Sequence, residues 1–563
     1  MAIMSGGEAV VKSLEEEGAR VAFGVLGSHL MPTYDALIES SVKLITPRSE
    51  DGVGHMADAY TRISGNPGVV LTTAGPGAAG VACAMGEAYN ESWPLLHIST
   101  QILSEYVGKN KGFYHDGPNQ GEMFVPVSSW QHSVTRIEEI PEAINEAYRR
   151  MRTGRPRPVF LDIPTDFLNG ETDFKILPKA KVAPPSLRKT EISNAIQLVR
   201  NSKRPAIGAG GGVVKAKAST ELREIAERLQ APVFCTNGSK GVLPEDHGLA
   251  LGNLLSMSTT LQEKVLAKSD LVLALGTRFS QRATKQWTLP IPGKIIHCDI
   301  DPEEFGRNYA PTATVEGDAK IILQGLINSL DESKIPKAAD RTPEIQTLKA
   351  AAIEEMKGKH PEIFHAMEEI RRILPRDAIV ASQSIMGHWT RFGFQCYQPG
   401  QFLFANTFGS MGYAFHAAVG AKAAFPERTV IGFCGDGGFI FGCGELATLQ
   451  QYNIAMPIVV FNNGGYSIIR QRQDARYNRN IGTRLTNPDY VTLAHAFGFY
   501  GEQVHDIGDL APAIERALKA DKTTIIEVPL EFEGYRSAAD SQLQVTGSTD
   551  TNQWATTIHS SKK

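Results

Sequence analysis

No stretch of this 563-residue chain approaches the roughly 20 consecutive apolar residues that a membrane-spanning helix needs. The first 20 residues carry several acidic side chains and lack the apolar core of a secretory signal peptide. Excess charge of one sign is also missing, because 57 Lys and Arg residues face 61 Asp and Glu residues, for a formal net charge of −4. We therefore expect neither nucleic acid nor an anionic membrane as a partner.

The six cysteines form no CxxC pair and show no regular spacing. Their pattern argues against a disulfide framework or a thiolate zinc site and is typical of a reducing cytoplasm, where we expect the protein to be. The apolar fraction of 42% and the charged fraction of 21% are those of an ordinary folded chain. At about 100–200 residues per domain, the length predicts three or four domains. Secreted, fibrous and disordered classes are disfavoured, which leaves a soluble multidomain protein, most simply an enzyme.

Short apolar runs, many of them β-branched, alternate with amphipathic helical stretches along most of the chain. Clear examples are residues 69–71, 158–161, 271–275, 294–296 and 458–461. Runs this short, followed by glycine and a helical pattern, are typical of parallel strands buried on both faces of a sheet. The pattern predicts an α/β fold with several doubly wound parallel sheets.

Two stretches of unusual composition predict where one group of strands ends and the next begins. Residues 178–189 are rich in proline and lysine, which disfavours a helix or a central strand. Residues 331–360 are charged and follow the second group of strands. After residue 532 the chain becomes polar and rich in serine and threonine, which favours a frayed terminus over a lid that orders on ligand binding.

The sharpest motif is Gly435-Asp436-Gly437-Gly438, which directly follows the apolar run 429–433. Glycines between a strand and a helix allow backbone N–H groups to approach a phosphate. Asp436 offers a hard oxygen ligand, and Asn463, 27 positions later and after a second apolar run, offers another, with the Gly465 carbonyl beside it. Together with diphosphate oxygens, these groups suit the near-octahedral shell of Mg²⁺.

This spacing, GDG followed about two dozen residues later by NN, resembles the thiamine-diphosphate motif of the 2-oxo-acid decarboxylase and acetolactate synthase superfamily. Other segments are similar to that family in the expected order. They are the strand-end glutamate and following helix at 46–60, the TSGPG-like turn at 72–77, the GxRxxxR-like and IDxDP-like segments at 275–282 and 297–302, and the GTMG-like loop at 408–414. The resemblance covers about residues 5–530.

The resemblance implies an α/β fold of three doubly wound parallel-sheet domains. They are a pyrimidine-binding domain at 1–180, a central Rossmann-like domain at 190–335 and a diphosphate-binding domain at 360–532, before a polar C-terminal tail at 533–563. In this family the cofactor lies between the first domain of one subunit and the third domain of another, so we expect a homodimer at minimum and a homotetramer as the usual assembly. Some relatives bind FAD or a nucleotide in the central domain. The glycine-rich segment 208–212 suits either that role or plain strand-to-helix packing, and the sequence leaves the ligand unassigned.

The chemistry of this cofactor starts with loss of a proton from C2 of the thiazolium ring, relayed through a carboxyl group at the pyrimidine N1′. Glu50 stands where the family carries that carboxyl group, although a lone glutamate there also suits a helix N-terminus. Met411 matches the bulky side chain that supports the bent cofactor, and Gly409 lies in the same loop. The resemblance assigns further cofactor contacts to Thr73, Pro76, Ser384, Gly435, Gly437, Gly438 and Ile468.

The resemblance is looser at the substrate end. Ser28 and His29 stand where acetolactate synthases carry a Gly-Gly-like pair, and this loop is also similar to that of benzoylformate decarboxylase and benzaldehyde lyase. Both side chains can hydrogen-bond a substrate carboxylate or carbonyl, and histidine titrates near neutrality. His115 falls near the position where the family places Gln or His facing the cofactor. Either histidine alone is equally well explained as a structural residue.

The resemblance implies an enzyme dependent on thiamine diphosphate and Mg²⁺ that decarboxylates a 2-oxo acid and joins the product to a second carbonyl, as acetolactate synthases do. The alternative is a 2-hydroxy ketone lyase or a 2-oxo acid decarboxylase of the benzaldehyde lyase or benzoylformate decarboxylase kind. Residues 128–130 read Ser-Ser-Trp, so the lysine typical of acetolactate synthases is missing. A relative that only binds the cofactor is disfavoured, because it would not need Glu50. The sequence does not name the acyl donor or acceptor, or decide whether a CoA ester is involved.

Overall fold

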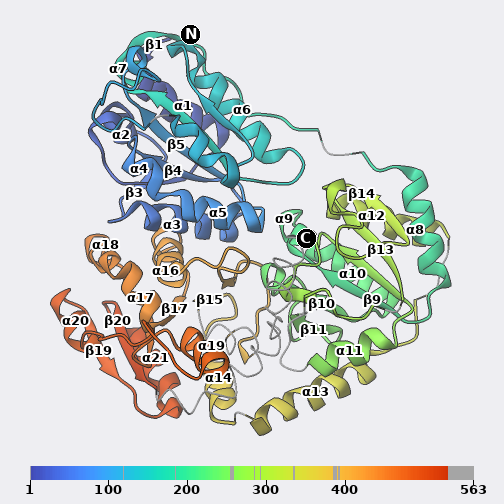
Figure 1. Ribbon diagram of the computed structural model, residues 1–563. Helices are drawn as coiled ribbons and strands as arrows, with labels where there is room; N and C mark the ends of the chain where they lie inside the picture. Colours follow the sequence, from blue (N-terminus) through green and yellow to red (C-terminus); the bar gives the residue numbers. More distant parts are fainter. Residues whose placement is uncertain are drawn as a thin grey trace, which may run out of the picture.

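The computed structural model describes residues 2–530 apart from 118, 184–185, 254–258, 285, 292, 334–336, 360, 384–389 and 391–392. These residues form three six-stranded sheets, in which all neighbouring strands are parallel, and a two-stranded antiparallel sheet. Figure 1 shows each large sheet flanked by helices. The predicted α/β fold with three parallel sheets is confirmed, and the polar tail at 533–563 lies outside the described residues.

The first sheet contains the strands nearest the N-terminus, in the order β3-β2-β4-β5-β7-β6. These strands are β2 (Val21–Gly24), β3 (Lys43–Ile45), β4 (Gly68–Thr72), β5 (Leu95–Gln101), β6 (Gln131–Ser133) and β7 (Val159–Pro164). Figure 1 shows α1 (Gly6–Glu17) and α6 (Ile140–Arg152) on one side of this sheet, with α3 (Glu50–Ser64) and α5 (Ala82–Glu91) on the other. β1 (Ala2–Ser5) and β8 (Glu171–Phe174) pair beside it.

The second, central sheet has the order β11-β10-β9-β12-β13-β14, which in chain order reads 3-2-1-4-5-6 and is the Rossmann arrangement. Its strands are β9 (Pro205–Ala209), β10 (Val233–Cys235), β11 (Ala250–Asn253), β12 (Leu271–Leu275), β13 (Lys294–Asp299) and β14 (Ala313–Glu316). The helices around it are α8 (Lys189–Asn201), α9 (Gly211–Lys215), α10 (Ser219–Leu229), α11 (Thr259–Ala267) and α12 (Ala319–Glu332).

The third sheet has the order β16-β15-β17-β18-β20-β19. Its strands are β15 (Ile379–Ser382), β16 (Phe402–Leu403), β17 (Val430–Gly435), β18 (Pro457–Asn462), β19 (Tyr500–Gln503) and β20 (Thr524–Pro529). Its helices include α14 (Pro361–Ile373), α16 (Tyr413–Ala424), α17 (Asp436–Gly442), α19 (Ser467–Tyr477), α20 (Tyr490–Ala496) and α21 (Leu510–Lys519). Ranked in chain order, the first and third sheets both read 2-1-3-4-6-5, so they share one topology.

The first and third sheets are joined through α3 and α16, which pack against each other. A Cβ on Gly420 would lie 2.5 Å from the Cα of Met56, so the absence of a side chain at Gly420 permits this close helix contact. A buried hydrogen bond also crosses the contact, from the Tyr413 hydroxyl of α16 to Asp58 of α3 at 2.9 Å. Arg62, one turn further along α3, forms an ion pair with the same Asp58 at 2.7 Å. Two distant parts of the chain thereby share one core.

The two predicted linkers differ in structure. The described part of residues 178–189 has no regular structure before α8 begins at Lys189. Most of the charged segment at 331–360 is instead helix α13 (Thr342–Lys359), which packs against α11 and α14. Between residues 2 and 530, leaving out the undescribed positions, the chain has no helix with the length and apolarity needed to cross a membrane.

Candidate active site

Every described candidate residue lies at the carboxyl end of a strand in the first or third sheet or in the segment that follows that strand. After β2, β3, β4 and β5 come, in that order, Ser28 with His29, Glu50, Thr73 with Pro76, and His115. At or after the ends of β16, β17 and β18 come Gly409 with Met411, Gly435 to Gly438, and Asn463 with Gly465 and Ile468. Ser384 lies outside the described residues. Because parallel strands end at a common edge, the topology gathers each set at one edge of its sheet.

Asp436 is the centre of a polar network on the third sheet. Its side chain is buried, and its Oδ2 accepts hydrogen bonds from the Gly465 N–H at 3.0 Å and from Asn487 Nδ2 at 2.8 Å. Its Oδ1 accepts from the Gly437 N–H at 2.9 Å. Asn487 Nδ2 also donates to Asn462 Oδ1, so one amide connects the loops after β17 and β18. The structure therefore brings Asp436 and Gly465 together.

Asn463 Oδ1 is buried and has no hydrogen-bond partner among the described residues. Buried acceptors are normally paired, so an unpaired amide oxygen in the loop whose Gly465 N–H binds Asp436 is suited to a cation. Asp436, Asn463 and the Gly465 carbonyl are all hard oxygen donors, and the set fits Mg²⁺ on its chemistry. Gly465 has no room for a side chain, because a Cβ there would lie 2.1 Å from the Thr483 carbonyl oxygen.

Two glycines of the 435–438 turn lie close to other side chains. A Cβ on Gly437 would lie 2.6 Å from the Tyr466 ring, and a Cβ on Gly438 would lie 3.0 Å from Gln383 Nε2. Gly435 and Gly438 are half-buried and have no side chains, so a ligand at the start of α17 meets backbone N–H groups, which suits a diphosphate. Ile468 is half-buried in the first turn of α19, beside this edge.

Glu50 is the first residue of α3 and is half-buried. Ser49 caps the helix by accepting from the Gly52 N–H at 3.1 Å. The Glu50 side chain packs over Gly80, where a Cβ would lie 2.6 Å from the Glu50 Cβ. Burial, and secondarily the Glu50 carboxylate, raises the pKa of Tyr34. Glu50 therefore stands at a helix N-terminus and also follows the end of β3.

His29 and His115 lie side by side, with ring centroids 5.4 Å apart and an edge-to-face geometry. Burial and then the neighbouring His115 lower the pKa of His29, so the neutral imidazole prevails near pH 7. His29 Nδ1 is buried without a hydrogen-bond partner among the described residues, while Ser28 is exposed. His115 has a left-handed φ of 67°, which is uncommon for a residue with a side chain. The structure thus brings together two histidines that lie in separate loops of the sequence.

Thr73 connects this pair to the turn after β4. Its Oγ1 lies 3.4 Å from His115 Nδ1, and Pro76 is exposed at the start of α4 (Pro76–Gly80). The buried Gln120 accepts from the Gly75 N–H at 2.7 Å and fixes the turn.

Gly409 and Met411 are exposed in the loop between β16 and α16, and 37% of Met411 is accessible. This loop is held by Glu87 of α5, which accepts from the N–H groups of Asn406 at 3.1 Å and Gly409 at 3.0 Å. Burial raises the pKa of Glu87 to about 7. The loop expected to support the cofactor is therefore positioned by a side chain of the first domain.

Sequence reasoning missed the residues that position these loops: Glu87, Gln120, Gln383, Glu445 and Asn487. Glu445 accepts from the N–H groups of Arg48 and Ser49 at 3.0 Å and so holds the segment that leads to Glu50. None of the five stands in a distinctive spacing, so no pattern in a single sequence marks them.

A cavity of about 1130 Å³ lies between the first and central domains. Its lining includes Arg155, the 210–212 turn, Lys215 and Arg278. Burial lowers the pKa of Lys215 to about 7, and its ammonium lies 4.0 Å from the centre of the Trp93 ring. A Cβ on Gly210 would lie 2.1 Å from the Gly276 carbonyl oxygen, so this glycine is required for packing between two strand ends.

Three protein-family models match successive segments of the chain. Residues 4–123 match "Thiamine pyrophosphate enzyme, N-terminal TPP binding domain". Residues 192–326 match "Thiamine pyrophosphate enzyme, central domain", and residues 384–528 match "Thiamine pyrophosphate enzyme, C-terminal TPP binding domain". The three matches fall on the three sheets in the order of the chain.

Curated relatives match over almost the whole length. A probable acetolactate synthase large subunit of Methanocaldococcus jannaschii is 34% identical over 547 residues, which cover 94% of this chain and 92% of the relative. The acetolactate synthase large subunit of Corynebacterium glutamicum is 33% identical, with 93% and 86% covered. A probable 2-ketoarginine decarboxylase of Pseudomonas aeruginosa is 32% identical, with 93% and 94% covered.

Proposed function

This chain belongs to the thiamine pyrophosphate enzymes of the acetolactate synthase type, and from that premise we propose that it decarboxylates a 2-oxo acid and joins the remaining acyl unit to a second carbonyl compound, with Mg²⁺ as the bound ion. The single observation that carries the ion assignment is the cluster of Asp436, Asn463 and Gly465, with its unpaired buried oxygen. When bound, thiamine diphosphate supplies a carbon nucleophile at C2 that adds to the substrate carbonyl and accepts the electrons left by CO₂.

In this proposal the edge of the third sheet binds the metal ion and the diphosphate, and the edge of the first sheet handles the proton. On the third sheet, Asp436, Asn463 and Gly465 hold Mg²⁺, and the backbone of the 435–438 turn binds the diphosphate. Ile468 and Met411 provide apolar support, and Gly409 presents backbone groups. On the first sheet, the Glu50 carboxyl group holds and returns one proton at the cofactor, with Thr73 and Pro76 lining the same edge.

His29, His115 and Ser28 orient the substrate in this proposal. An imidazole carries two ring nitrogens that can hydrogen-bond, so the pair can hold a carboxylate or a carbonyl oxygen and move a proton. The same pair also supports the alternative function, a 2-oxo acid decarboxylase or 2-hydroxy ketone lyase, because an imidazole beside the substrate can supply the proton needed to release an aldehyde product.

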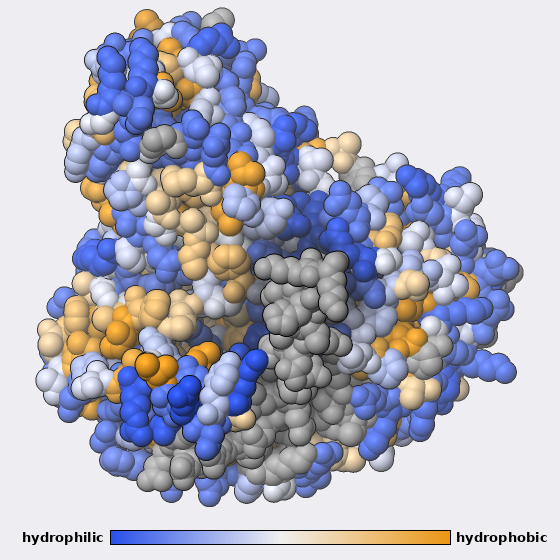
Figure 2. Space-filling view, viewed as in Figure 1, coloured by the Kyte–Doolittle hydropathy of each residue, from blue (hydrophilic) through white to orange (hydrophobic). Residues whose placement is uncertain are grey.

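We also propose that the active protein is a homodimer, assembled further as a homotetramer. Apolar side chains are exposed at the site edges, with Phe408 49%, Met411 37% and Phe441 59% accessible. Figure 2 shows apolar side chains gathered on the face where the N-terminal and C-terminal sheets meet. A second copy on this face would bury them and bring a first-sheet edge to a third-sheet edge. Light scattering in solution tests the assembly, and a monomer that retains full activity would exclude it.

For the central cavity we propose a phosphate-bearing nucleotide, with FAD and simpler nucleotides both left open. Arg155 and Arg278 line the cavity, where they form ion pairs with Glu304 and Glu91, and guanidinium groups are typical donors to phosphates. The absorbance spectrum of the purified protein tests for flavin, and calorimetric titration with ADP tests for a nucleotide. Absence of both signals would leave the glycine turn with a packing role alone.

The experiment that tests the main function is a substrate panel. The protein is incubated with thiamine diphosphate, Mg²⁺ and a series of 2-oxo acids or 2-hydroxy ketones, and CO₂, aldehydes and ketol products are followed. CO₂ with a ketol supports the carboligase, CO₂ with an aldehyde supports the decarboxylase, and cleavage of a hydroxy ketone supports the lyase. Glu50→Gln is the matched inactive control. No turnover of any compound above that control would contradict the proposal.

A further inference from the structure

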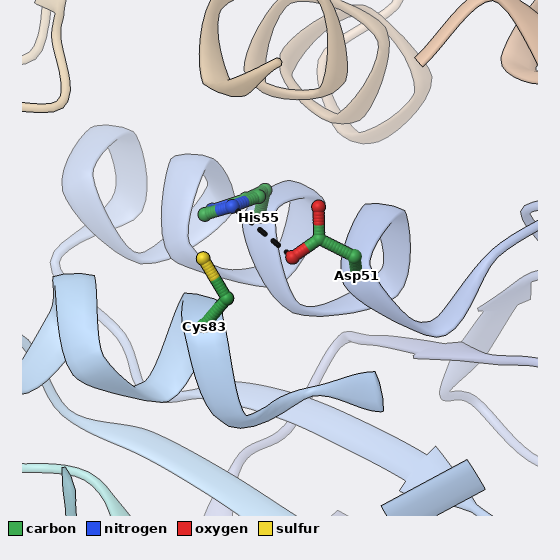
Figure 3. Close-up of side chains that lie close together, drawn as sticks. All are labelled: Asp51, His55 and Cys83. Atoms are coloured by element: carbon green, nitrogen blue, oxygen red, sulfur yellow. Dashed lines mark ion pairs between the residues drawn. The ribbon is translucent and has the colours of Figure 1, made fainter. Parts of the chain in front are cut away.

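Asp51, His55 and Cys83 converge from two helices of the first domain. Figure 3 shows Asp51 and His55 on successive turns of α3, with the Cys83 side chain rising toward them from α5. One ligand atom from each residue lies within 4.8 Å of those of the other two. Asp51 Oδ1 and His55 Nε2 are already 3.4 Å apart.

These polar groups lack hydrogen bonds where burial demands them. His55 is completely buried, and neither ring nitrogen has a hydrogen-bond partner among the described residues. Asp51 Oδ1 is also buried without such a partner. Buried imidazoles and carboxylates are normally satisfied, because desolvation without compensation is costly. An electron-pair acceptor between the side chains would satisfy both.

We propose that Asp51, His55 and Cys83 bind one borderline divalent cation, such as Zn²⁺, with water in the fourth position. Carboxylate, imidazole and thiolate together are a donor set that Zn²⁺ accepts and that Mg²⁺ does not favour. Tetrahedral bonds of about 2.0–2.3 Å require ligand atoms roughly 3.3–3.8 Å apart. The Asp51–His55 separation meets this requirement, and a rotation of the exposed Cys83 side chain closes the rest.

The surroundings match such an ion. The carboxyl groups of Asp51 and Glu87 act on the Cys83 thiol and favour a cation there, while Arg62 acts on His55 and is partly offset by its contact with Glu87. His416 of α16 approaches from the other side, with Nδ1 4.0 Å from Asp51 Oδ2. The Asp51 side chain is 34% accessible and Cys83 is exposed, which leaves an entry path. On binding, the thiol loses its proton to solvent and the sulfur becomes the third ligand.

This site is distinct from the oxygen-only cluster at Asp436 and does not depend on the proposed activity. It does adjoin the residues proposed to contact the cofactor: Asp51 follows Glu50 in the chain, and the Cys83 thiol donates at 3.3 Å to Ser410, one residue before Met411. An ion there would fix the start of α3 relative to α5.

The test uses tag-free full-length protein saturated with thiamine diphosphate and Mg²⁺, so that the oxygen-only cluster is filled. Co²⁺ is titrated in, and the thiolate-to-cobalt charge-transfer absorbance is recorded. Zn²⁺ is then added as a competitor, and bound metal is counted after dialysis. We expect one equivalent of Co²⁺ with a thiolate band, its displacement by Zn²⁺, and a higher melting temperature with Zn²⁺.

Cys83→Ser should abolish the band and weaken Zn²⁺ binding by at least about tenfold. Loss of a residue that only supports a metal ligand typically lowers affinity by about 10–100-fold, and Cys83 is itself a ligand. Asp51→Asn, at a partly exposed side chain, should weaken Zn²⁺ binding without loss of the fold. Cys443→Ser, at a half-buried thiol outside the cluster, and Asp436→Ala should both keep the band. A wild-type protein without a thiolate band, or a band that survives Cys83→Ser, would overturn the proposal.

Discussion

The first and third sheets have the same strand order, yet their edges carry different chemistry. In each, the loops after the first four strands in chain order meet at one edge. On the first sheet, the loops carry titratable groups: His29 after β2, Glu50 after β3 and His115 after β5. On the third sheet, they carry glycines and the oxygen donors Asp436 and Asn463. Topology therefore decides where a site forms, and loop residues decide what the site does.

Within the described part of the chain, each edge has an unpaired buried polar atom, Asn463 Oδ1 on the third sheet and His29 Nδ1 on the first. The edges differ, however, in how firmly their main charged or titratable groups are held. Asp436 accepts three hydrogen bonds from its own domain, which makes it a rigid anchor. His29 Nδ1 has no hydrogen-bond partner among the described residues, and His115 has a strained backbone. Unsatisfied and strained groups concentrate at functional sites. We expect the third-sheet edge to anchor the cofactor and the first-sheet edge to move protons.

Glu50→Gln should have the largest effect, because it removes the proton relay while it keeps the shape of the side chain. We expect turnover and deuterium exchange at C2 of the bound cofactor to fall by about 10²–10⁴-fold, with cofactor affinity nearly unchanged. Exchange is measured by NMR after acid quench. The control Glu105→Gln, at an exposed carboxyl group of the same sheet edge, should behave as wild type. Unchanged exchange in Glu50→Gln would remove this residue from the mechanism.

Asp436→Ala should instead weaken cofactor and metal binding while leaving proton exchange at C2 intact once both are bound. We expect the Mg²⁺ and thiamine diphosphate concentrations needed for half-saturation to rise together by about 10–100-fold or more, since the ion bridges protein and diphosphate. At saturation, exchange at C2 should recover. Asn487→Ala removes only the amide that bridges the two loops, so its shift should be smaller. Normal cofactor binding in EDTA would show that the anchor is not a metal site.

His29→Ala should lower turnover by about ten- to hundredfold, the range expected for a lost hydrogen bond to a charged group. Cofactor affinity should stay nearly intact, since the anchor lies on the other sheet. Steady-state kinetics on the best substrate measure the effect, and Ser28→Ala, at an exposed hydroxyl, should lose less. Wild-type kinetics would make His29 structural and favour the carboligase over the lyase.

His97 should make the stability of the folded protein fall at acid pH. Among these substitutions, replacement of His97 should alter activity at neutral pH least. Burial lowers its pKa from 6.5 to about 3. The unfolded chain binds a proton that the folded chain does not, so stability is complete above pH 6.5 and is lost as pH falls toward 3. This amounts to about 1.4 kcal/mol per pH unit within that window.

Urea unfolding at pH 6.5 and 4.5 measures this loss, which His97→Gln should remove. The exposed His495 of α20 in the third domain provides the control, and His495→Gln should leave the pH dependence unchanged. An equal pH dependence in wild type and His97→Gln would show that other groups cause it.

Much of the fold follows from local pattern. Apolar runs at 69–71, 271–275 and 458–461 became β4, β12 and β18, because parallel strands covered on both faces must be apolar throughout. The charged segment at 331–360 was the exception. Its composition suggested a linker, yet most of it is helix α13, since packing against α11 and α14 stabilises a helix whose own sequence shows little amphipathic pattern.

The sequence by itself determined which chemical groups stand at the ends of which strands, and through the GDG and NN spacing it determined the family. Only the tertiary structure decided which groups meet. Glu445 holds the chain before Glu50 across nearly 400 positions, and Asp51 meets Cys83 from another helix. Burial, hydrogen-bond partners and pKa depend on neighbours that are distant in the chain, and no spacing in one sequence records those neighbours.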